Sequence, residues 1–182
     1  TEDRPGTFDD WMFTIDNYSL SVFFYVLKNC ILQGAIKMEL SNGFINARHL
    51  DDKAGVAALL GAAKWIKDHD ISLPADIHLL FTISEEVGSG ASAILHGDIA
   101  EMVSIDNATC APGQNSDPYG ITIAMADSSG PFDYHLNQHL IQLCHNFQLQ
   151  HSRDIFRHYR CDSASAVEAG NDIRTALIAF AV

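Results

Sequence analysis

Residues 76–90 read DIHLLFTISEEVGSG, a mostly apolar run that ends at two adjacent glutamates and is followed by two glycines. The run at 76–84 is typical of a buried strand. The glycines predict a turn directly after it, and we expect a short helix around residues 91–95. Glu85 and Glu86 therefore stand at a strand end, where crowded and poorly hydrated carboxylates need a bound cation or a shared proton.

A second acidic pair, Asp51 and Asp52, lies upstream inside RHLDDKAG at residues 48–55. The segment 43–47 should be extended and should lead into this pair. A helix is predicted from about residue 52 to 69, where a Ser-Leu-Pro sequence follows. The apolar residues that recur at helical spacing are Val56, Leu59, Leu60, Ala63 and Ile66.

Downstream of the glutamates, extended and helical segments continue to alternate. Extended segments are predicted at residues 102–106, 120–126, 155–159 and 175–182, and helices at residues 132–147 and 163–169. Asp106 ends the first of these strands. This alternation predicts an α/β layered domain with a mostly parallel or mixed central sheet flanked by helices, and with its site at the carboxyl ends of the strands.

The composition limits the possible functions of the chain. It has 182 residues, of which 47% are hydrophobic, enough for a real core. Lys plus Arg number 11 against 23 Asp plus Glu, and the net charge of −12 argues against a nucleic-acid partner. The sequence has no apolar run of roughly 18 residues, so we expect no membrane span. The four cysteines lack CxxC spacing, which favours a reducing compartment, and a cytoplasmic location is predicted.

Three separate strand ends supply acids: Asp51, the glutamate pair and Asp106. Zinc, cobalt or manganese accepts carboxylate oxygen, and two such ions about 3.5–4 Å apart require a bridging ligand, for which an aspartate suffices. Of two adjacent acids, one can bind metal while the other serves as general base. The alternative for each acid is that it only caps a helix, but three coordinated strand ends favour a two-ion site.

The motifs HLDDKAGVAALL, TISEEVGSGAS and VSIDNA, with ADSSGPFDYH downstream, resemble the glutamyl aminopeptidase family of two-metal peptidases, which includes the tetrahedral aminopeptidases. The resemblance runs from about Gly43 to the C-terminus. It implies that Asp51 bridges the two metals and is joined to Asp52 by a cis peptide bond. It further implies that Glu85 is the general base, that Glu86 binds one metal, and that Asp106 binds the other.

The resemblance also points to residues near the substrate. The stretch YRCDSASA at residues 159–166 sits where the family places a Gly-Thr-Asp-Ala-like turn, so Asp162 is a candidate for supporting the metal site or contacting substrate. A helix N-cap is the alternative for Asp162. Asp52 is likewise a candidate for supporting the metal site or contacting substrate. The run from Phe156 to Thr175 resembles the branch of the family linked to the osmoprotectant N-acetylglutaminylglutamine amide.

This chain departs from the family in its histidines. Family members supply two histidine ligands, one far upstream of the bridging aspartate and one just beyond the last core strand, and neither is evident here. His49 spells H-x-D with Asp51, but the resemblance places it on the approach to the aspartate rather than at the metal. The histidines after the acidic motifs are expected to be solvated or hydrogen-bonded. They are His135, His139, His145, His151 and His158.

The chain is thus interpreted as a fragment or truncated copy of a metal-dependent aminopeptidase, with residues 43–182 forming a partial catalytic domain and the fragment inactive alone. Residues 1–42 are unassigned, and one interpretation is the remnant of an inserted β-rich domain. Two functional alternatives stay open: a metallo-deacylase or amide hydrolase acting on an N-acylated dipeptide amide, and a non-catalytic peptidase-like module. The implied substrate is a peptide or small amide, and the intact protein is expected to be a homo-oligomer.

Overall fold

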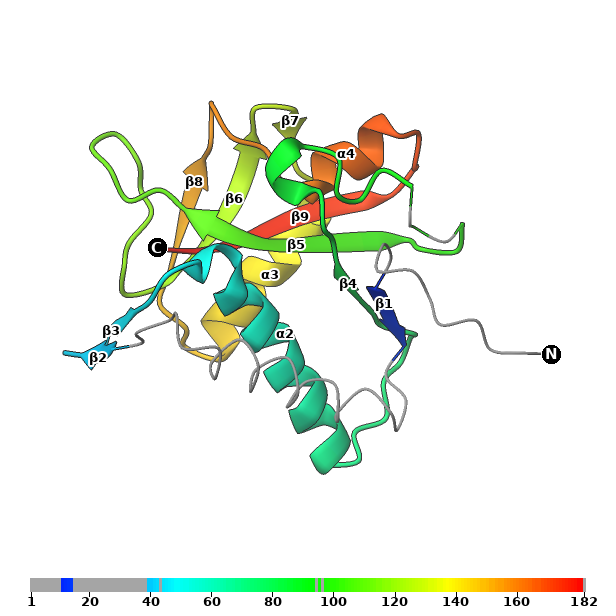
Figure 1. Cartoon of the computed structure of the whole chain (residues 1–182), viewed down its shortest axis with the longest axis horizontal. Coiled ribbons are helices and arrows are strands. Elements are labelled where there is room, and N and C mark those ends of the chain that lie inside the picture. Colours follow the sequence, from blue (N-terminus) through cyan, green and yellow to red (C-terminus); the bar gives the residue numbers. More distant parts are fainter. Residues whose placement is uncertain (1–10, 15–38, 43, 94, 96, 182) are drawn as a thin grey trace. The chain divides into compact units, whose positions relative to one another are not determined.

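The computed structural model describes residues 11–14, 39–42, 44–93, 95 and 97–181 (Figure 1). Two compact units make up the chain, one of residues 11–81 and one of residues 82–182 together with 1–10. The expectation for residues 1–42 falls largely outside the described residues.

The unit of residues 11–81 combines two small antiparallel strand pairs with one long helix. Strand β1 pairs with β4, and β2 pairs with β3. The bounds are Trp11–Thr14 for β1, Glu39–Ser41 for β2, Phe44–Asn46 for β3, Leu50–Asp68 for α2 and His78–Phe81 for β4. The strand predicted at 76–84 is therefore present but shorter.

Helix α2 confirms the helix predicted from the apolar spacing. All five residues of the predicted apolar face are partly buried, whereas Ala57, Ala58, Gly61, Ala62 and Trp65 between them are exposed. The helix is thus amphipathic, as its sequence period requires. It ends at Asp68, where the backbone N–H of His69 donates to the Trp65 carbonyl and that of Asp70 donates to the Lys67 carbonyl.

The unit of residues 82–182 is built on one mixed five-stranded sheet, which confirms the predicted fold class. Strand β6 pairs antiparallel with β9 and β7 and parallel with β8, while β9 pairs parallel with β5. The bounds are Glu85–Val87 for the 3-10 helix η1, Glu101–Ala108 for β5, Ile121–Asp127 for β6, Gly130–Pro131 for β7, Tyr134–Asn146 for α3, His151–Ile155 for β8, Asp162–Glu168 for α4 and Arg174–Ala181 for β9.

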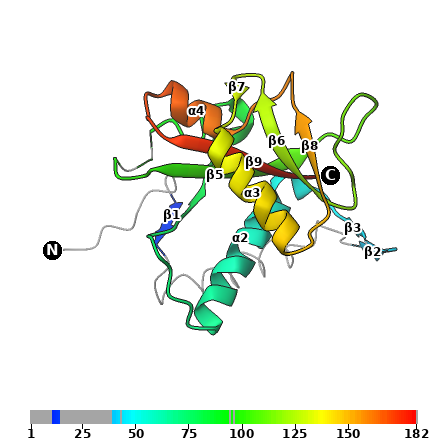
Figure 2. The ribbon, with the colours of Figure 1, turned by 180° about the vertical axis from the view of Figure 1, so that it is seen from behind.

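Helices cover this sheet. Helix α3 crosses one face, behind the strands in Figure 1 and in front of them in Figure 2. Ile141 and Cys144 of α3 pack on Ile123 of β6, with Ile178 of β9 beside them. Because side chains alternate along a strand, the residues adjacent to Ile123 and Ile178, which are Ala124 and Leu177, belong to a different cluster. That second cluster also contains Ala108, Phe132, Phe156, Cys161 and Ala179.

Two predicted elements are wrong in place. Residue 91 lies in a turn, residues 92 and 93 form a bend, and residue 95 has no regular structure, so the expected helix does not occur in these described residues; a single helical turn comes earlier, in η1. The strand expected at 155–159 lies instead at 151–155. Its sequence, HSRDI, is mostly polar and therefore does not show the apolar pattern from which strands are predicted. Strand β5 also runs to Ala108, so Asp106 lies within the strand and not at its end.

Three cysteines fall within the described residues, and all are free thiols: Cys110, Cys144 and Cys161. Burial raises the pKa of Cys144 and of Cys161, so both side chains stay neutral at physiological pH. Among the described residues, no helix combines the length and the apolar character needed to cross a lipid bilayer.

Candidate active site

The first acidic pair shapes the start of α2. The Asp51–Asp52 peptide bond is cis, as the resemblance implies. Asp51 and Asp52 have non-helical dihedral angles, so the regular helix begins after them. The Asp52 carboxylate accepts a hydrogen bond of 2.9 Å from the backbone N–H of Gly55, which is how a helix N-cap binds. Asp52 therefore caps α2, and Asp51 beside it is exposed.

The cap formed by Asp52 requires a glycine at position 55. A Cβ at this position would collide with the Asp52 carboxylate, with its Cγ only 2.8 Å away. The Asp-Asp-Lys-Ala-Gly sequence thus contains both the cap and the glycine that leaves room for it.

The second acidic pair lies in a tight turn. Glu85 and Glu86 open the 3-10 helix η1, and Gly88 closes it with φ of 77°. The backbone N–H of Gly88 donates to the Glu85 carbonyl at 2.7 Å, and Ser89 N–H donates to the Ser84 carbonyl at 3.1 Å. Glu85 is partly buried and Glu86 is exposed. We call residues 84–90 the glutamate turn.

Asp162, at the start of α4, contacts both ends of the glutamate turn. Its Oδ2 accepts a 2.6 Å hydrogen bond from the Thr82 hydroxyl, just before the turn. At the end of the turn, a Cβ on Gly90 would collide with Asp162 Oδ1 and lie 2.7 Å from Thr82 Oγ1. The absent side chain at Gly90 is therefore what lets the turn close on Asp162.

Burial raises the pKa of Asp162, and the opposing hydrogen bonding from Thr82 and from the backbone N–H of Ala91 does not cancel it. The Asp162 Oδ1 atom is buried and has no well-formed hydrogen bond within the described residues. Its side chain is not the N-cap of α4, which Cys161 occupies without a side-chain bond. Asp162 instead supports the backbone next to the glutamates.

Two further residues that grip the glutamate turn were not predicted. Arg160 Nη2 and the Ser165 hydroxyl both donate to the Gly88 carbonyl, at 2.9 Å and 2.8 Å. They lie 72 and 77 residues from Gly88 in the sequence. No local spacing pattern marks such contacts, and neither residue type is a metal ligand of the expected kind.

Asp106 is a partly buried residue of β5. Its Oδ1 accepts a 2.6 Å hydrogen bond from the backbone N–H of Asn107. Two residues earlier, the hydroxyl of Ser104 is bonded to that of Ser163 in α4 at 2.7 Å, and both serines are buried. Helix α4 is thus fastened to the strand that carries Asp106.

The histidines behave as expected for solvated or hydrogen-bonded side chains. His135, His139, His145 and His158 are exposed, and so is His49. His151 Nδ1 lies 3.0 Å from the Leu149 carbonyl, and its ring packs edge-on against that of His145 at a centroid distance of 4.9 Å. Across the described residues, no three His, Cys, Asp or Glu side chains gather as a possible ion site.

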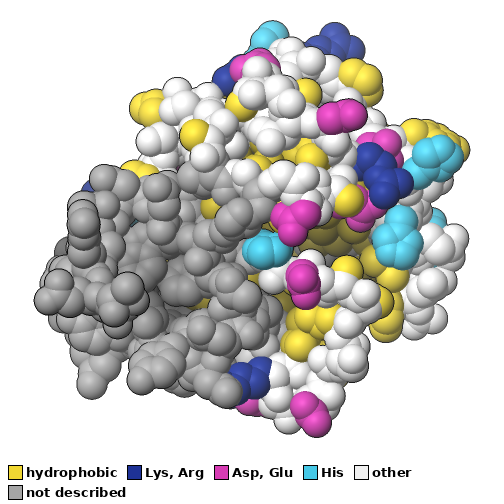
Figure 3. Space-filling view, turned by 90° about the vertical axis from the view of Figure 1, so that its right-hand side faces the viewer, with side chains coloured by type: hydrophobic (Ala, Val, Ile, Leu, Met, Phe, Trp, Pro, Cys, Tyr) yellow, Lys and Arg dark blue, Asp and Glu magenta, His cyan; other side chains and the backbone are white. Residues whose placement is uncertain are grey.

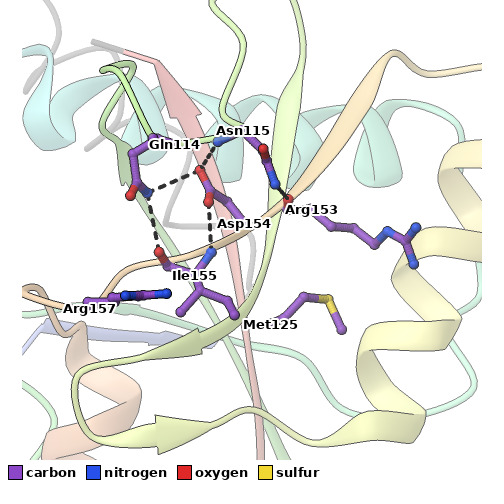
Figure 4. Close-up of a pocket in the computed structure, with 8 residues that line it drawn as sticks. Gln114, Asn115, Met125, Arg153, Asp154, Ile155 and Arg157 are labelled. Atoms are coloured by element: carbon purple, nitrogen blue, oxygen red, sulfur yellow. Dashed lines mark hydrogen bonds between the residues drawn. The ribbon is translucent and has the colours of Figure 1, made fainter.

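A pocket of about 430 Å³ lies elsewhere in this unit, and none of the predicted site residues line it. Asp154 of β8 organises its wall (Figure 4). Asp154 Oδ2 accepts hydrogen bonds from the backbone N–H groups of Asn115 and Ser116, the Ser116 hydroxyl and the Gln114 amide. The Gln114 and Asn115 side chains also donate to the carbonyls of Ile155 and Arg153.

The donors around Asp154 explain its charge state. Although burial alone raises the pKa of Asp154, the hydrogen bonds from Ser116, Ile155 and Asn115 outweigh it and hold the pKa below its ordinary value. This carboxylate is therefore ionised and structural.

In the view of Figure 3, acidic side chains are scattered over the described surface rather than gathered in one patch.

The sequence matches the model of one protein family over residues 30–182, the M42 glutamyl aminopeptidases. A relative, YhfE of Bacillus subtilis (strain 168), is named a putative aminopeptidase. It is 38% identical over 138 residues, which are 76% of this chain and 40% of the relative.

Solved structures share the fold. A TET aminopeptidase from Thaumarchaeota archaeon SCGC AB-539-E09 superposes with a TM-score of 0.67 at 20% identity, over 80% of this chain and 44% of that one. The Pyrococcus horikoshii TET1 peptidase gives a TM-score of 0.66 at 23% identity, over 79% and 44%. The chain spans less than half the length of these relatives. Because the family match includes both acidic pairs, Asp106 and the sheet, the chain belongs to the M42 glutamyl aminopeptidase family.

Proposed function

We propose that this chain supplies the acidic half of the active site of a metal-dependent aminopeptidase, which removes residues from the free N-terminus of peptides. The family match over residues 30–182 carries this proposal, because it spans all the acids singled out in the sequence. The family description and the name of the Bacillus subtilis relative both refer to aminopeptidases, which supports this function over amide hydrolysis or a non-catalytic role.

The donor chemistry suits two divalent ions of the zinc, cobalt or manganese type. Asp51 would bridge the ions, while Glu86 would hold one and Asp106 the other. All three are carboxylates, and Asp51 and Glu86 are exposed, so an ion can reach them. When bound, the ions would supply an acidified water and stabilise negative charge on the peptide carbonyl oxygen.

Glu85 has the properties of the proton acceptor. It precedes a metal-ligand candidate, is partly buried, and lies in a turn whose backbone is bonded at both ends. A carboxylate in such a position can take the proton of the attacking water and pass it to the leaving amine. Asp52 would fix the backbone next to Asp51 through its cap, and Asp162 would fix the glutamate turn through Thr82.

The test is peptide hydrolysis by the protein made from its complete reading frame, stripped of metal and then given zinc, cobalt or manganese. We expect turnover of peptides with a free N-terminus and no turnover after chelation. Glu85→Gln should lower kcat by about 1000-fold, because general-base catalysis contributes about 100- to 10,000-fold. Glu101→Gln is the matched control, since Glu101 is an exposed glutamate paired with Arg174.

The substrate panel separates the functional alternatives. Hydrolysis of an N-acetylated dipeptide amide in preference to free peptides would reject the aminopeptidase proposal. It would favour an amide hydrolase of the osmoprotectant branch. If the wild-type protein turns over neither substrate with any of the three metals, the result would favour a non-catalytic peptidase-like module. Retention of most activity by Glu85→Gln would remove Glu85 from the proposed role.

We also propose that the complete protein forms a homo-oligomer and that the 182-residue chain is a fragment without activity of its own. The Pyrococcus horikoshii TET1 peptidase can assemble into a tetrahedron or a large octahedral shell, which supports the first proposal. The second rests on the ligand count, because three carboxylates leave two ions without the nitrogen donors that favour zinc or cobalt. Assaying the chain beside the complete protein tests it.

A further inference from the structure

The carbonyl of Gly88 is bound by two side chains from outside the glutamate turn. It accepts one hydrogen bond from Arg160 Nη2 at 2.9 Å and one from the Ser165 hydroxyl at 2.8 Å. The N–H of the same residue donates to the Glu85 carbonyl at 2.7 Å. Gly88 is therefore held on both sides, and it is only two residues from Glu86.

The geometry of Arg160 suits this contact. Arg160 Nη1 lies 2.8 Å and 2.9 Å from the two carboxylate oxygens of Glu168, which holds that edge of the guanidinium and leaves Nη2 for the Gly88 carbonyl. The φ of 77° at Gly88 favours glycine, and a Cβ there would stand in ordinary van der Waals contact with Arg160 Nη2, at 3.4 Å.

Arg160 and Ser165 belong to a segment that is fixed to the sheet. Helix α4 is joined to β5 by the buried Ser104–Ser163 bond, and its Ala164 and Ala166 are 5% and 0% exposed. Strand β5 carries Asp106 two residues beyond Ser104. The segment from Arg160 to Ser165 therefore contacts both the glutamate turn and the strand that carries the third acid of this unit.

We infer that Arg160 is a positioning residue, which sets the place of Glu85 and Glu86 relative to β5 by holding the Gly88 carbonyl. This inference rests on the proposed function for its catalytic consequence. Arg160 acts through the backbone and is not required to touch substrate. Such control matters because a misplacement of about 1 Å can lower a rate about 100-fold.

The experiment compares Arg160→Met with Arg174→Met in the complete protein. Arg174 forms a similar exposed ion pair, with Glu101, but the structure shows it bonded outside the glutamate turn, so this variant controls for the loss of an arginine–glutamate pair. Arg160→Lys keeps a cation that can donate to the carbonyl. Thermal unfolding is recorded for each variant, so that general loss of fold is recognised.

Three measurements follow. Amide hydrogen exchange of Gly88 and Ser89, whose N–H groups donate within the turn, should be about tenfold faster in Arg160→Met, because a charge-assisted hydrogen bond is lost. The dissociation constant for Co²⁺, followed by its absorption, should rise about tenfold. The kcat should fall about tenfold with KM unchanged, and Arg160→Lys should restore most of each loss.

Exchange at Gly88 and Ser89 that is equal in Arg160→Met and Arg174→Met would overturn the inference, whatever the activity. So would a variant with faster exchange but wild-type Co²⁺ affinity and kcat. A wild-type protein that neither binds Co²⁺ nor hydrolyses peptides would instead reject the proposed function, and the exchange comparison would still decide whether Arg160 holds the turn.

Discussion

Asp154 and Asp162 anchor two loops of the same unit, but their carboxylate oxygens receive very different sets of hydrogen bonds. Asp154 accepts four hydrogen bonds at Oδ2 and a fifth at Oδ1, from the Ile155 N–H at 2.8 Å. Within the part of the chain that the structure describes, Asp162 Oδ2 accepts from Thr82, whereas the buried Oδ1 receives no bond of comparable geometry, and the Ala91 N–H contributes only weakly. The pKa is accordingly lowered at Asp154 and raised at Asp162.

The comparison separates a structural carboxylate from one beside a candidate active site. A loop that only has to be held in place can surround its anchor with donors, as residues 113–116 do around Asp154. The glutamate turn instead closes on Asp162 by close packing at Gly90, and the hydrogen bonds that Asp162 receives do not outweigh its burial. Under-satisfied polar groups of this kind tend to occur where function constrains the local structure.

The largest effect should come from Gly90, with Gly113 of the other loop as its control. Gly90→Ala would place a Cβ against Asp162 Oδ1 and Thr82 Oγ1, so we expect about 3 kcal/mol of destabilisation from overpacking. Gly113→Ala, in the other loop, meets no atom within 4 Å and carries only the cost of its φ of 93°, about 1 kcal/mol. Urea unfolding measures both.

A double-mutant cycle identifies the cause at Gly90. If the clash is with Asp162, the combination of Gly90→Ala with Asp162→Ala should recover at least about 1 kcal/mol relative to the sum of the single variants. Additive effects would show that Asp162 is not what requires glycine at position 90, and the contrast between the two loops would fail at this point.

The two aspartates themselves should differ next. Asp154→Asn replaces one acceptor oxygen by a donor amide and removes the charge that five donors bind, so we expect about 2 kcal/mol of destabilisation. Asp162→Asn keeps an oxygen for Thr82 and removes a buried charge, so its cost should stay below about 1 kcal/mol. Equal costs in urea unfolding at neutral pH would break the comparison.

The smallest effect is the pH dependence, and its sign is opposite at the two sites. Because the folded pKa of Asp154 is lowered, its stabilisation is complete above about pH 4 and is lost as the pH falls through the folded pKa. Because the folded pKa of Asp162 is raised, its ionisation penalty appears as the pH rises above about 4 and is complete above the folded pKa.

Unfolding free energies of the wild type and both Asn variants between about pH 3 and 7 test this difference. The advantage of the wild type over Asp154→Asn should shrink toward acid pH. The stability of the wild type relative to Asp162→Asn should decrease as the pH rises. The same sign at both positions would contradict the contrast.

Most of the secondary structure was predictable because periodic burial imposes periodic sequence. Helix α2 shows this with its five spaced apolar residues, and β9 with its near-continuous apolar run. Strand β8 was misplaced because His151 to Asp154 are polar, and the need for Asp154 is created by a loop about 40 residues away. The helix expected after Gly90 is wrong, because the helical turn forms before that glycine, at Glu85–Val87.

The candidate site was predictable only where its chemistry is written in short motifs. The two acidic pairs and Asp106 stand out as carboxylates near strand ends, and the cis bond at Asp51 agrees with the resemblance. Arg160 and Ser165 gave no such signal. Their roles depend on a fold that brings residues more than 70 positions apart into contact with a backbone carbonyl, which has no sequence of its own.

The side-chain amides that line the pocket in Figure 4 have a consequence for assembly. Gln114 and Asn115 donate to the carbonyls of Ile155 and Arg153, which alternate along β8 with the residues whose carbonyls face β6. A strand from another molecule that extended the sheet at β8 would need those same carbonyls as acceptors. It would first have to displace two amides, so this edge is guarded against unintended strand addition and aggregation.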